Sequence, residues 1–400
     1  MARRTPGPGR AKSSALPSRV AAPIRGRESL DGALDEAIEI AGADHATRLN
    51  LVIDGQAVSW CSVVDFHQQV GPCLLRMGGL AGVGTRKEHR HKGYCRRVLT
   101  SALRWMRREG YDASMLYGIT GMYPKFGYVE AFPDVSWRLA VRDAETAPRG
   151  AYCVVDFDPA RHLRAVLKLY RATNLGRTGV TTRDAKTWTP FRLGRSYRSH
   201  GVVKCLCDGR GHVVGYLVHD SERAAEVIEA GWSSPRVFGA LLAAAADGAW
   251  AERAEMITFH LPSDDAFMRY CRRYGLTCEQ TCRRDGGAMA RLINVPSALA
   301  KLADLLGKRV GGAGQLNIVT NLDSAALSWR RGSMIVKTAP LAGAPTARLP
   351  QWALAQLVYG YLSAADLHED GILKAPRNVV DLLTTLFPPT EHYHYHTDRF

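Results

Sequence analysis

The chain has 400 residues, 46% of them hydrophobic and 23% charged, a composition typical of a globular protein long enough for two or three domains. Its formal net charge of +15 at pH 7 favours anionic partners such as nucleic acids or phosphorylated ligands. No zinc-finger spacing, aromatic RNA-binding strand or basic-zipper heptad accompanies that charge, so we expect no specific nucleic-acid partner.

Two further features argue against a membrane-spanning protein and against a disulfide framework. The longest apolar stretch, Val237 to Trp250, is interrupted by Asp247 and is shorter than the roughly 20 residues that span a bilayer. The nine cysteines are an odd number scattered along a long chain, which indicates reduced thiols in a cytoplasm. Neither Cys205 to Cys207 nor Cys271 to Cys282 has zinc spacing, so we expect strand and helix packing rather than a metal there.

Residues 1–28 are rich in Pro, Gly, Ser and Ala and contain seven basic residues against one acid, Glu28. This composition predicts a disordered tail. Arg19 and Arg25 interrupt any apolar core of a signal peptide, although an Arg-rich, acid-poor segment also fits a transit peptide or a start site placed too far upstream.

The next segment predicts a mixed α/β unit over residues 29–145. A helix over 29–41 is followed by three strands, and the Asp-Gly pair between the first two favours a hairpin. A charged turn and a long helix from Gly93 come next, with a stop at Gly110. The strands are expected at 48–53, 57–66 and 73–85, and after the long helix come a strand at 113–118, a short helix at 121–126 and a strand at 129–139.

The same alternation restarts after a polar linker over 142–150. Residues 150–292 therefore read as a second copy of the architecture, but the charged turn is absent and we expect no cofactor site there. The expected elements are strands at 152–157, 202–207, 212–218 and 256–261 and helices at 159–173, 235–251 and 264–274.

From residue 296 the pattern changes to that of a separate α+β domain, 296–400, which ends in an aromatic, His-rich tail. Its expected elements are helices at 297–306 and 351–362 and strands at 314–320, 325–330 and 333–338. The predicted fold class of the chain is thus α/β (α+β) with mixed sheets.

The charged turn contains the sequence Arg90-His-Lys-Gly-Tyr-Cys95 between a strand and a helix. The first N–H groups of a helix have no intrahelical partner, so a pyrophosphate can accept hydrogen bonds from them. Gly93 permits close approach of the backbone, and the basic side chains of residues 86–97 add positive charge. The alternative interpretation is a solvated, basic helix start.

The strand before this turn contains Gly82 and Gly84, which weaken a strand unless a bulge or a ligand needs the room. A bulge would splay two neighbouring strands. The amides of a pantetheine arm could then bond the exposed backbone of Val83 to Thr85 like an added strand.

Strand, turn and helix together resemble the acetyl-CoA motif of the GNAT superfamily, with Cys95 in place of the usual Gly or Ala. Tyr117 to Tyr128 resembles the second GNAT signature, in which the tyrosine that matches Tyr123 faces the cofactor sulfur. The resemblance implies that Tyr123 is the general acid; the alternative is a half-buried core aromatic. It also implies acetyl-CoA as co-substrate, bound by Val83, Gly84, Thr85, Arg90, His91, Lys92, Gly93, Tyr94, Cys95, Arg96, Gly118 and Ile119.

From about residue 45 the chain is similar to the enhanced intracellular survival (Eis) family of GNAT enzymes. The similarity is carried by Asn174 to Gly179 with Trp188, by Ala290 to Val295, by Leu349 to Leu362 and by Leu386-Phe387-Pro388. It implies tandem GNAT folds, a sterol-carrier-protein-like third domain and a homo-oligomer, often a hexamer. The basic tail and the predicted helix before residue 45 depart from the family pattern.

In this family the chain terminus enters the first active site and its carboxylate acts as base, a role that falls here on Phe400. The alternative is a frayed terminus. His392, His394 and His396 alternate with tyrosines and would share one face of an extended segment, so three imidazoles could bind zinc. Because the family uses no metal, we expect these side chains to line the acceptor channel instead, and His396 could relay a proton.

The expected activity is direct transfer of acetyl from acetyl-CoA to a small-molecule or peptide amine in the cytoplasm. The positive Arg399 beside the terminus favours an acceptor less cationic than an aminoglycoside. One rival is a lipid- or ligand-binding protein that uses the third domain and has vestigial GNAT sites. Another is a nucleic-acid-binding protein that uses the basic tail.

Overall fold

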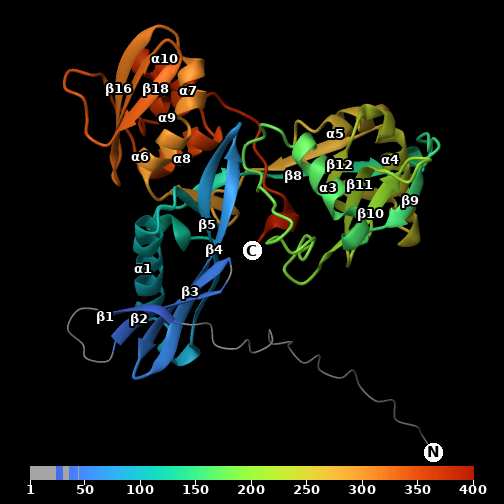
Figure 1. Cartoon of the computed structure of the whole chain (residues 1–400), viewed down its shortest axis with the longest axis horizontal. Helices are drawn as coiled ribbons and strands as arrows, with labels where there is room; N and C mark the ends of the chain where they lie inside the picture. The colour runs from blue at the N-terminus through green and yellow to red at the C-terminus, as the bar shows by residue number, and fades with distance from the viewer. Residues whose placement is uncertain (1–23, 30–35, 44) are drawn as a thin grey trace, which may run out of the picture.

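The computed structural model describes residues 24–29, 36–43 and 45–400. Their strands form an eight-stranded, a seven-stranded and a four-stranded sheet, which lie in three lobes (Figure 1). The predicted α/β class with mixed sheets is confirmed. Most of the disordered tail predicted for residues 1–28 lies outside the described residues, but its residues 24–28 belong to a strand, β1 (Ile24–Ser29).

The first sheet positions the candidate site. α1 (Tyr94–Arg108) packs against it with the predicted apolar face, and Leu99 and Met106 are buried against Leu49 and Val63. Its strands in spatial order are β1 (Ile24–Ser29), β2 (Glu36–Ala43), β3 (Ala46–Ile53), β4 (Gln56–Val70), β5 (Cys73–Thr85), β6 (Ala113–Tyr117), β15 (Ala288–Leu292) and β7 (Val129–Phe132).

The helix predicted for residues 29–41 is wrong where the chain is described, because β2 replaces it from Glu36 onward. β2 pairs antiparallel with β3 along its whole length. Ile38 and Ile40 are buried and Glu39 between them is less so, which is the period of a strand. The apolar residues of this segment also fit a helical spacing, and pairing with β3 determines that the segment is a strand. Residues 30–35 of the predicted helix lie outside the described residues.

The strand predicted for residues 129–139 is divided at Pro133 into β7 and β8 (Asp134–Ala140). Proline lacks the N–H that a central strand requires, so the ladder breaks there. β8 crosses into the second sheet, and β15 returns from the second unit to lie between β6 and β7. Thus β8, which directly follows β7 in the chain, belongs to the second sheet, and β15, which follows the last strand of the second sheet, belongs to the first sheet.

The second unit contains the predicted strands and helices in the predicted order, but the strands at 226–232 and 277–281 of its sheet were not predicted. The strands of this sheet in spatial order are β14 (Thr277–Thr281), β8, β13 (Met256–Phe259), β12 (Glu226–Trp232), β11 (Val213–Asp220), β10 (Gly201–Cys207) and β9 (Cys153–Asp156). Its helices are α2 (Val141–Ala144), α3 (Pro159–Thr173), α4 (Phe238–Ala251) and α5 (Ala266–Cys271), and α5 continues as a short 3-10 turn to Tyr274.

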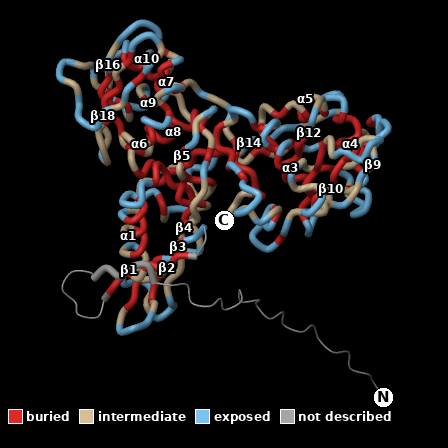
Figure 2. The backbone as a smooth tube through the Cα atoms, viewed as in Figure 1, coloured by how far each residue is buried: buried red, intermediate tan, exposed pale blue. Residues whose placement is uncertain are grey.

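The third unit shares a hydrophobic core with the first sheet. Leu75 and Met77 of β5 belong to the same buried cluster as Leu354 and Tyr359 of α8, and Figure 2 shows buried residues running through this junction. Its strands are β16 (Ala313–Val319), β17 (Ser324–Arg330), β18 (Ser333–Lys337) and β19 (Thr346–Arg348), and its helices α6 (Val295–Lys301), α7 (Ala303–Arg309), α8 (Gln351–Tyr359), α9 (Ala364–Glu369) and α10 (Arg377–Leu386). The likeness of this unit to a sterol-carrier protein stays a prediction.

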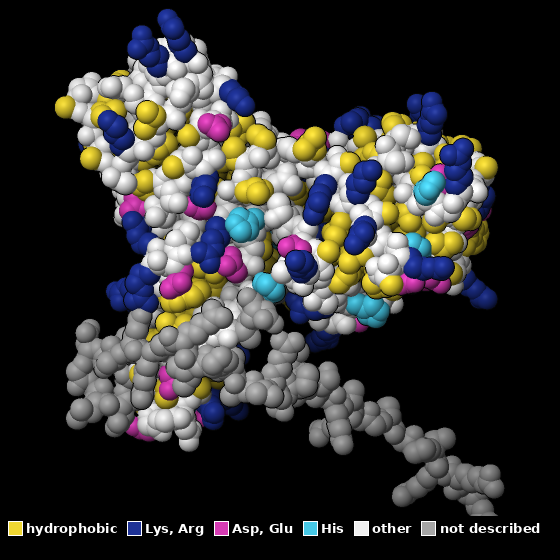
Figure 3. All heavy atoms as spheres, in the orientation of Figure 1, with side chains coloured by type: hydrophobic (Ala, Val, Ile, Leu, Met, Phe, Trp, Pro, Cys, Tyr) yellow, Lys and Arg dark blue, Asp and Glu magenta, His cyan; other side chains and the backbone are white. Residues whose placement is uncertain are grey.

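The basic side chains are spread over all three lobes on the face seen in Figure 3. None of the helices in the described ranges is both long and apolar enough to cross a membrane.

Candidate functional site

Strands β5 and β6 are neighbours for only three residue pairs, from Met77 with Ala113 to Gly79 with Met115. Beyond Gly79, β5 continues to Thr85 along β4, and the register between these two strands shifts opposite Gly82, which has φ +56°. A positive φ favours glycine, so Gly82 accommodates the bulge. The predicted bulge is therefore present, and it leaves one backbone edge of residues 80–85 without a neighbouring strand.

Glycine is required at position 84 because of packing rather than because of backbone conformation. A Cβ atom at this position would lie 2.7 Å from the indole ring of Trp60 on β4. The absence of a side chain thus lets Trp60 pack across the strand. Val83, Gly84 and Thr85, the residues predicted to bind a pantetheine arm, lie together at this end of β5.

The charged turn joins β5 to α1 and places its backbone toward open space. His91 and Gly93 have φ +63° and +79°, and a Cβ atom on Gly93 would meet no atom within 4 Å. Gly93 is the N-cap of α1 and no side chain caps that end, so the N–H groups of Tyr94, Cys95 and Arg96 point out of the helix.

The Arg90 side chain is exposed, and its Nε lies 3.5 Å from the carbonyl oxygen of Thr85. His91, Lys92 and Arg96 are exposed as well. The predicted anion-binding turn therefore has an uncapped helix end, a glycine that allows close approach and several solvent-facing cations.

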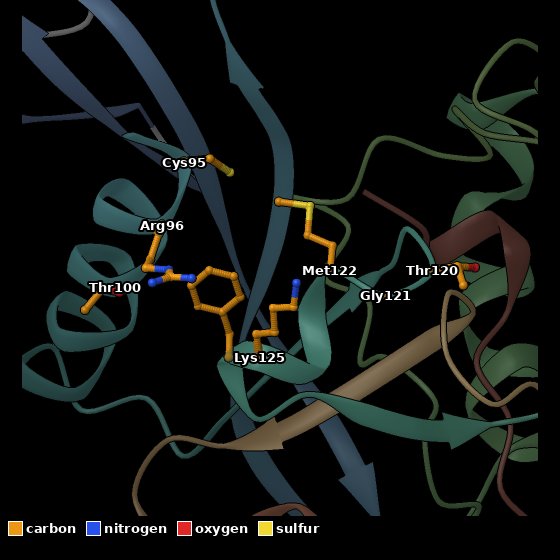
Figure 4. Close-up of a pocket in the computed structure, with 8 residues that line it drawn as sticks. Cys95, Arg96, Thr100, Thr120, Gly121, Met122 and Lys125 are labelled. Atoms are coloured by element: carbon orange, nitrogen blue, oxygen red, sulfur yellow. The ribbon is translucent and has the colours of Figure 1, made fainter. Parts of the chain in front are cut away.

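A cavity of about 680 Å³ lies between the start of α1 and the segment after β6 (Figure 4). Arg96 from α1 and Lys125 from the 3-10 helix η2 (Tyr123–Phe126) extend toward the space between these elements. Two cations on facing walls suit an anionic ligand. The lining residues are Cys95, Arg96, Thr100, Thr120, Gly121, Met122, Lys125 and Phe126.

Only Cys95 and Arg96 of these lining residues were predicted. Thr100 lies four residues after Arg96 on α1, so helical spacing contained a signal for it. Thr120 to Met122 are irregular and carry no periodic signal. The predicted Gly118 and Ile119 directly precede them, and Ile119 is 66% exposed.

Tyr123 is buried at the start of η2, with its ring 6.2 Å from that of Tyr128. Burial raises the pKa of Tyr123 to about 12, and the thiols of Cys95 and Cys61 act in the same direction. The phenol therefore keeps its proton at neutral pH. Burial also raises the pKa of the Cys95 thiol, so this cysteine is a thiol rather than a thiolate.

The last residue of the chain lies where β5 leaves β6. A Cβ atom on Gly79 would be 2.8 Å from two ring atoms of Phe400, so this glycine makes room for the ring. The Phe400 ring is 5.6 Å from that of Phe66 and 6.0 Å from that of Tyr117. Figure 1 shows the C-terminus between the first and second lobes.

The end of β6 brings Tyr123 and Phe400 to one place. Tyr117, the last residue of β6, contacts Phe400, and a Cβ atom on the following Gly118 would lie 3.2 Å from Cδ2 of Tyr123. Two residues separated by most of the chain therefore border the same strand end. Burial raises the pKa of Tyr117, so this phenol is protonated as well.

The tail that leads to Phe400 lies along the second unit. The N–H of Tyr393 donates to the carbonyl of Thr178 at 2.9 Å, and the Tyr395 hydroxyl donates to Oδ1 of Asn174 at 3.1 Å. His394 lies near the site, with its ring 6.0 Å from that of Tyr117 and Nδ1 3.0 Å from the Gly179 carbonyl. Burial lowers the pKa of His394, so its imidazole is neutral at pH 7.

The three tail histidines contact different carbonyl groups. Nδ1 of His392 lies 2.7 Å from the Thr390 oxygen, and Nδ1 of His396 lies 3.5 Å from the Arg195 oxygen. Among the residues that the structure describes, no group of three His, Cys, Asp or Glu side chains could hold a metal ion.

Residues 33–131 match the family model of an acetyltransferase (GNAT) domain. No curated protein matches the chain. Among solved structures, the chain is similar to a probable N-acyltransferase from Enterococcus faecalis, with 16% identity, 89% of this chain and 90% of that chain covered, and a TM-score of 0.72. For a GCN5-related N-acetyltransferase from Anabaena variabilis the values are 17%, 88%, 89% and 0.70, and for Eis1 from Mycobacterium abscessus 16%, 88%, 90% and 0.64.

The chain therefore contains a GNAT acetyltransferase domain, and nearly its whole length shares the fold of Eis1. The predicted resemblance to the GNAT superfamily is confirmed by the family model over residues 33–131, and the resemblance to the Eis family is confirmed at the level of the fold. The family match covers the splayed strands, the charged turn, α1, β6 and Tyr123.

Proposed function

We propose that this protein is an N-acetyltransferase that moves an acetyl group from acetyl-CoA directly to an amine acceptor. The proposal depends on one observation: the Phe400 ring packs against Gly79, where β5 diverges from β6, and also contacts the ring of Tyr117. A chain terminus at the divergence of these two strands would bring its carboxylate close to the place where the acyl group would lie. Tyr123 borders the same strand end.

The residues present fit acetyl-CoA, whose thioester supplies the acetyl group. The unpaired backbone edge of Val83 to Thr85 would bond the two pantetheine amides as an added strand would. The N–H groups at the start of α1, together with Arg90 to Arg96, would hold the pyrophosphate. Gly118 and Ile119 would border the thioester end, and Arg96 and Lys125 add positive charge on the cavity walls.

In the proposed mechanism the ammonium of the acceptor first gives a proton to the Phe400 carboxylate, directly or through a water. An α-carboxylate has a reference pKa near 3.5, and the aromatic rings of Phe66 and Tyr117 around Phe400 would desolvate it and make it more basic. The free amine then attacks the acetyl carbonyl. As the C–S bond breaks, Tyr123 protonates the departing sulfur, and the remaining extra proton on the acceptor nitrogen passes to the Tyr123 phenolate, which restores the phenol. The protonated Cys95 thiol favours this direct transfer over an acyl-enzyme.

The test compares the wild-type chain with one lacking Phe400 and with one carrying two extra glycines after Phe400. Thiol release from acetyl-CoA is followed over a panel of primary amines, and acetyl-CoA binding is measured by isothermal titration calorimetry. We expect both altered chains to bind acetyl-CoA normally and to lose about a hundredfold in kcat, within the usual range for a general base. A chain extended at its N-terminus is the matched control.

Full activity of the extended chain would remove Phe400 from the mechanism. Lack of acetyl-CoA binding by the wild-type chain would overturn the whole proposal and favour the lipid-binding alternative. The acceptor is expected to be a small-molecule or peptide amine, and the panel identifies which class reacts.

The same proposal extends to organisation and assembly. Residues 29–145 would be the acetyltransferase domain, 150–292 a GNAT-like domain without a cofactor motif, and 296–400 a sterol-carrier-like domain whose last residue completes the site. The chain is expected to form a homo-oligomer, with a hexamer as the specific expectation. Sedimentation equilibrium measures this state, and a monomer at micromolar concentration would contradict it.

A further inference from the structure

A buried arginine of the second unit holds the chain terminus two residues before its end. Arg183 donates to both carboxylate oxygens of Glu229, at 2.7 and 2.6 Å, and to both of Asp398, at 2.8 and 3.0 Å. The side chains of Arg183 and Glu229 are 0% exposed and that of Asp398 is 1% exposed. One guanidinium thus joins a strand of the second sheet to the C-terminal tail.

Neighbouring side chains complete this anchor. The Arg183 guanidinium carbon lies 3.7 Å from the centre of the Tyr170 ring and 4.3 Å from that of the Trp188 ring. The Tyr170 hydroxyl donates to Asp398 at 3.1 Å, and the Thr397 hydroxyl accepts from Arg183 at 2.9 Å. The guanidinium is therefore in contact with two aromatic rings as well as with its hydrogen-bond acceptors, which restricts the geometry of the Asp398 carboxylate.

Stability alone gives a weak reason for this cluster. Burying one cation with two carboxylates leaves a net charge of −1, and a buried ion pair is seldom more stabilising than well-packed apolar side chains. Such pairs do impose a specific geometry. The geometry imposed here is the position of Asp398, and a chain extends at most about 3.6 Å per residue, so Phe400 is held within roughly 7 Å of that point.

The single residue between the anchor and the terminus is held as well. The Arg399 guanidinium carbon lies 4.4 Å from the centre of the Tyr117 ring, and Nη1 donates to the Arg195 carbonyl at 3.3 Å. The path from Asp398 to Phe400 is thus in contact with both units, and the Phe400 ring ends on Gly79.

We infer that Arg183 is a positioning residue, which with Glu229 and Asp398 holds the terminal residue at the divergence of β5 and β6. In this inference the second unit, which has no charged turn of its own, serves the first unit's site as the anchor of the tail. The inference rests on the proposed function for the role of Phe400 in turnover, but the anchoring itself is independent of that role.

Asp398→Asn is the most informative substitution. It removes the charge that ties the tail to Arg183, while Arg183 and Glu229 remain as a balanced pair, so the second unit is expected to fold. Asp381→Asn is the matched control, because Asp381 is a 67% exposed carboxylate paired with Arg377 on α10. Thr397→Val removes a weaker contact of the same anchor and is expected to give a smaller effect in the same direction.

The first measurement is the rate at which carboxypeptidase A releases phenylalanine from the folded full-length chain. This enzyme removes an aromatic terminal residue and stops at arginine, so it reports the detachment of Phe400 alone. Release is expected to be slow for the wild-type chain and for Asp381→Asn, and about tenfold or more faster for Asp398→Asn, because proteolysis follows the population of the opened state. Equal release rates in all three chains would overturn the inference.

The second measurement is turnover of acetyl-CoA with the best amine of the panel. Asp398→Asn is expected to keep the acetyl-CoA binding stoichiometry and dissociation constant of the wild-type chain while kcat falls about tenfold. Normal stoichiometry distinguishes a misplaced terminus from a partly unfolded preparation. Faster release of Phe400 with unchanged kcat would support the anchoring role of Arg183 and Asp398, and it would refute the catalytic role of Phe400.

Discussion

Burial raises the pKa of Tyr123 to about 12, so its phenol can donate a proton across the neutral pH range. Replacing Tyr123 with Phe removes the hydroxyl and keeps the ring packed near Gly118. We expect Tyr123→Phe to lower kcat by about a hundredfold, within the usual contribution of a general acid, and to leave acetyl-CoA binding unchanged. Thiol release and calorimetry measure the two quantities.

Tyr111→Phe is the control for that substitution, because Tyr111 is equally buried in the same core but packs against Trp105, away from the cavity. If the Tyr123→Phe variant turns over at the wild-type rate, Tyr123 is not the general acid and is a core aromatic residue.

Glu130 on β7 gives a prediction about stability and pH. Burial raises the pKa of its carboxyl from 4.5 to about 7, although the N–H of Gly287 partly opposes the shift. The folded chain therefore binds more protons than the unfolded chain between pH 4.5 and 7, and the free energy of unfolding falls as pH rises through this window, by up to about 3 kcal/mol.

Glu130→Gln removes the carboxyl and keeps its size. We expect the variant to be more stable than the wild-type chain at pH 8 and nearly equal to it at pH 5, as measured by urea denaturation. The exposed Glu279→Gln should follow the wild-type curve. Parallel pH dependences for Glu130→Gln and the wild-type chain would contradict the raised pKa.

Strand β5 determines where the terminus lies. Gly79 has no positive φ, so alanine suits its backbone, but the added methyl would lie 2.8 Å from atoms of the Phe400 ring. Gly79→Ala should displace the ring, lower kcat by about tenfold to a hundredfold and leave acetyl-CoA binding and the melting temperature nearly unchanged, because small misplacements of a catalytic group are costly.

Gly209→Ala is the matched control, since a Cβ atom there would meet nothing within 4 Å. The kinetics of the two variants separate a local effect on Phe400 from a general effect of substituting glycine. Wild-type kcat in Gly79→Ala would show that the ring position is irrelevant to turnover.

Comparing the predicted ends of strands and helices with the observed ends shows which elements are determined by the hydrophobic pattern of their own residues. α1 was predicted because its apolar positions repeat at helical spacing and Gly110 ends the run. β4 is longer than predicted, reaching Val70, because the second unit supports its end: the N–H of Gln69 donates to the Val180 carbonyl and that of Thr182 to the His67 carbonyl. Such support comes from residues more than 100 positions away and leaves no periodic signal.

The charged turn was predicted from the chemistry of its own residues, whereas the roles of Tyr123 and Phe400 were predicted only from the resemblance to a family. The insertion of β15 between β6 and β7, and the transfer of β8 to the second sheet, could not be predicted from alternating hydrophobicity, which does not name the partner of a strand. The same holds for Arg183, whose partners Glu229 and Asp398 lie 46 and 215 residues away.

The first and third units are also joined by a buried carboxylate. Asp112, which is 1% exposed, accepts from the N–H of Arg76 at 2.8 Å and from the hydroxyl of Ser297 at 2.5 Å. Asp112→Ala leaves both donors without this acceptor at the entry to the shared core. We expect a loss of about 3–6 kcal/mol in the free energy of unfolding, since two hydrogen bonds are lost and each hydrogen bond to a charged group contributes about 1.5–3 kcal/mol.

Because that core contains residues of the first sheet and of the third unit, the destabilisation should appear in both and spare the second unit. Hydrogen exchange followed by mass spectrometry tests this directly: amides of β5 and α8 should exchange faster in Asp112→Ala, and amides of β11 and β12 should not. Asp143→Ala, at a 48% exposed side chain, is the control. Faster exchange in all three sheets would mean that the chain unfolds as one cooperative body, and faster exchange in β5 alone would mean that the third unit is stable without the junction.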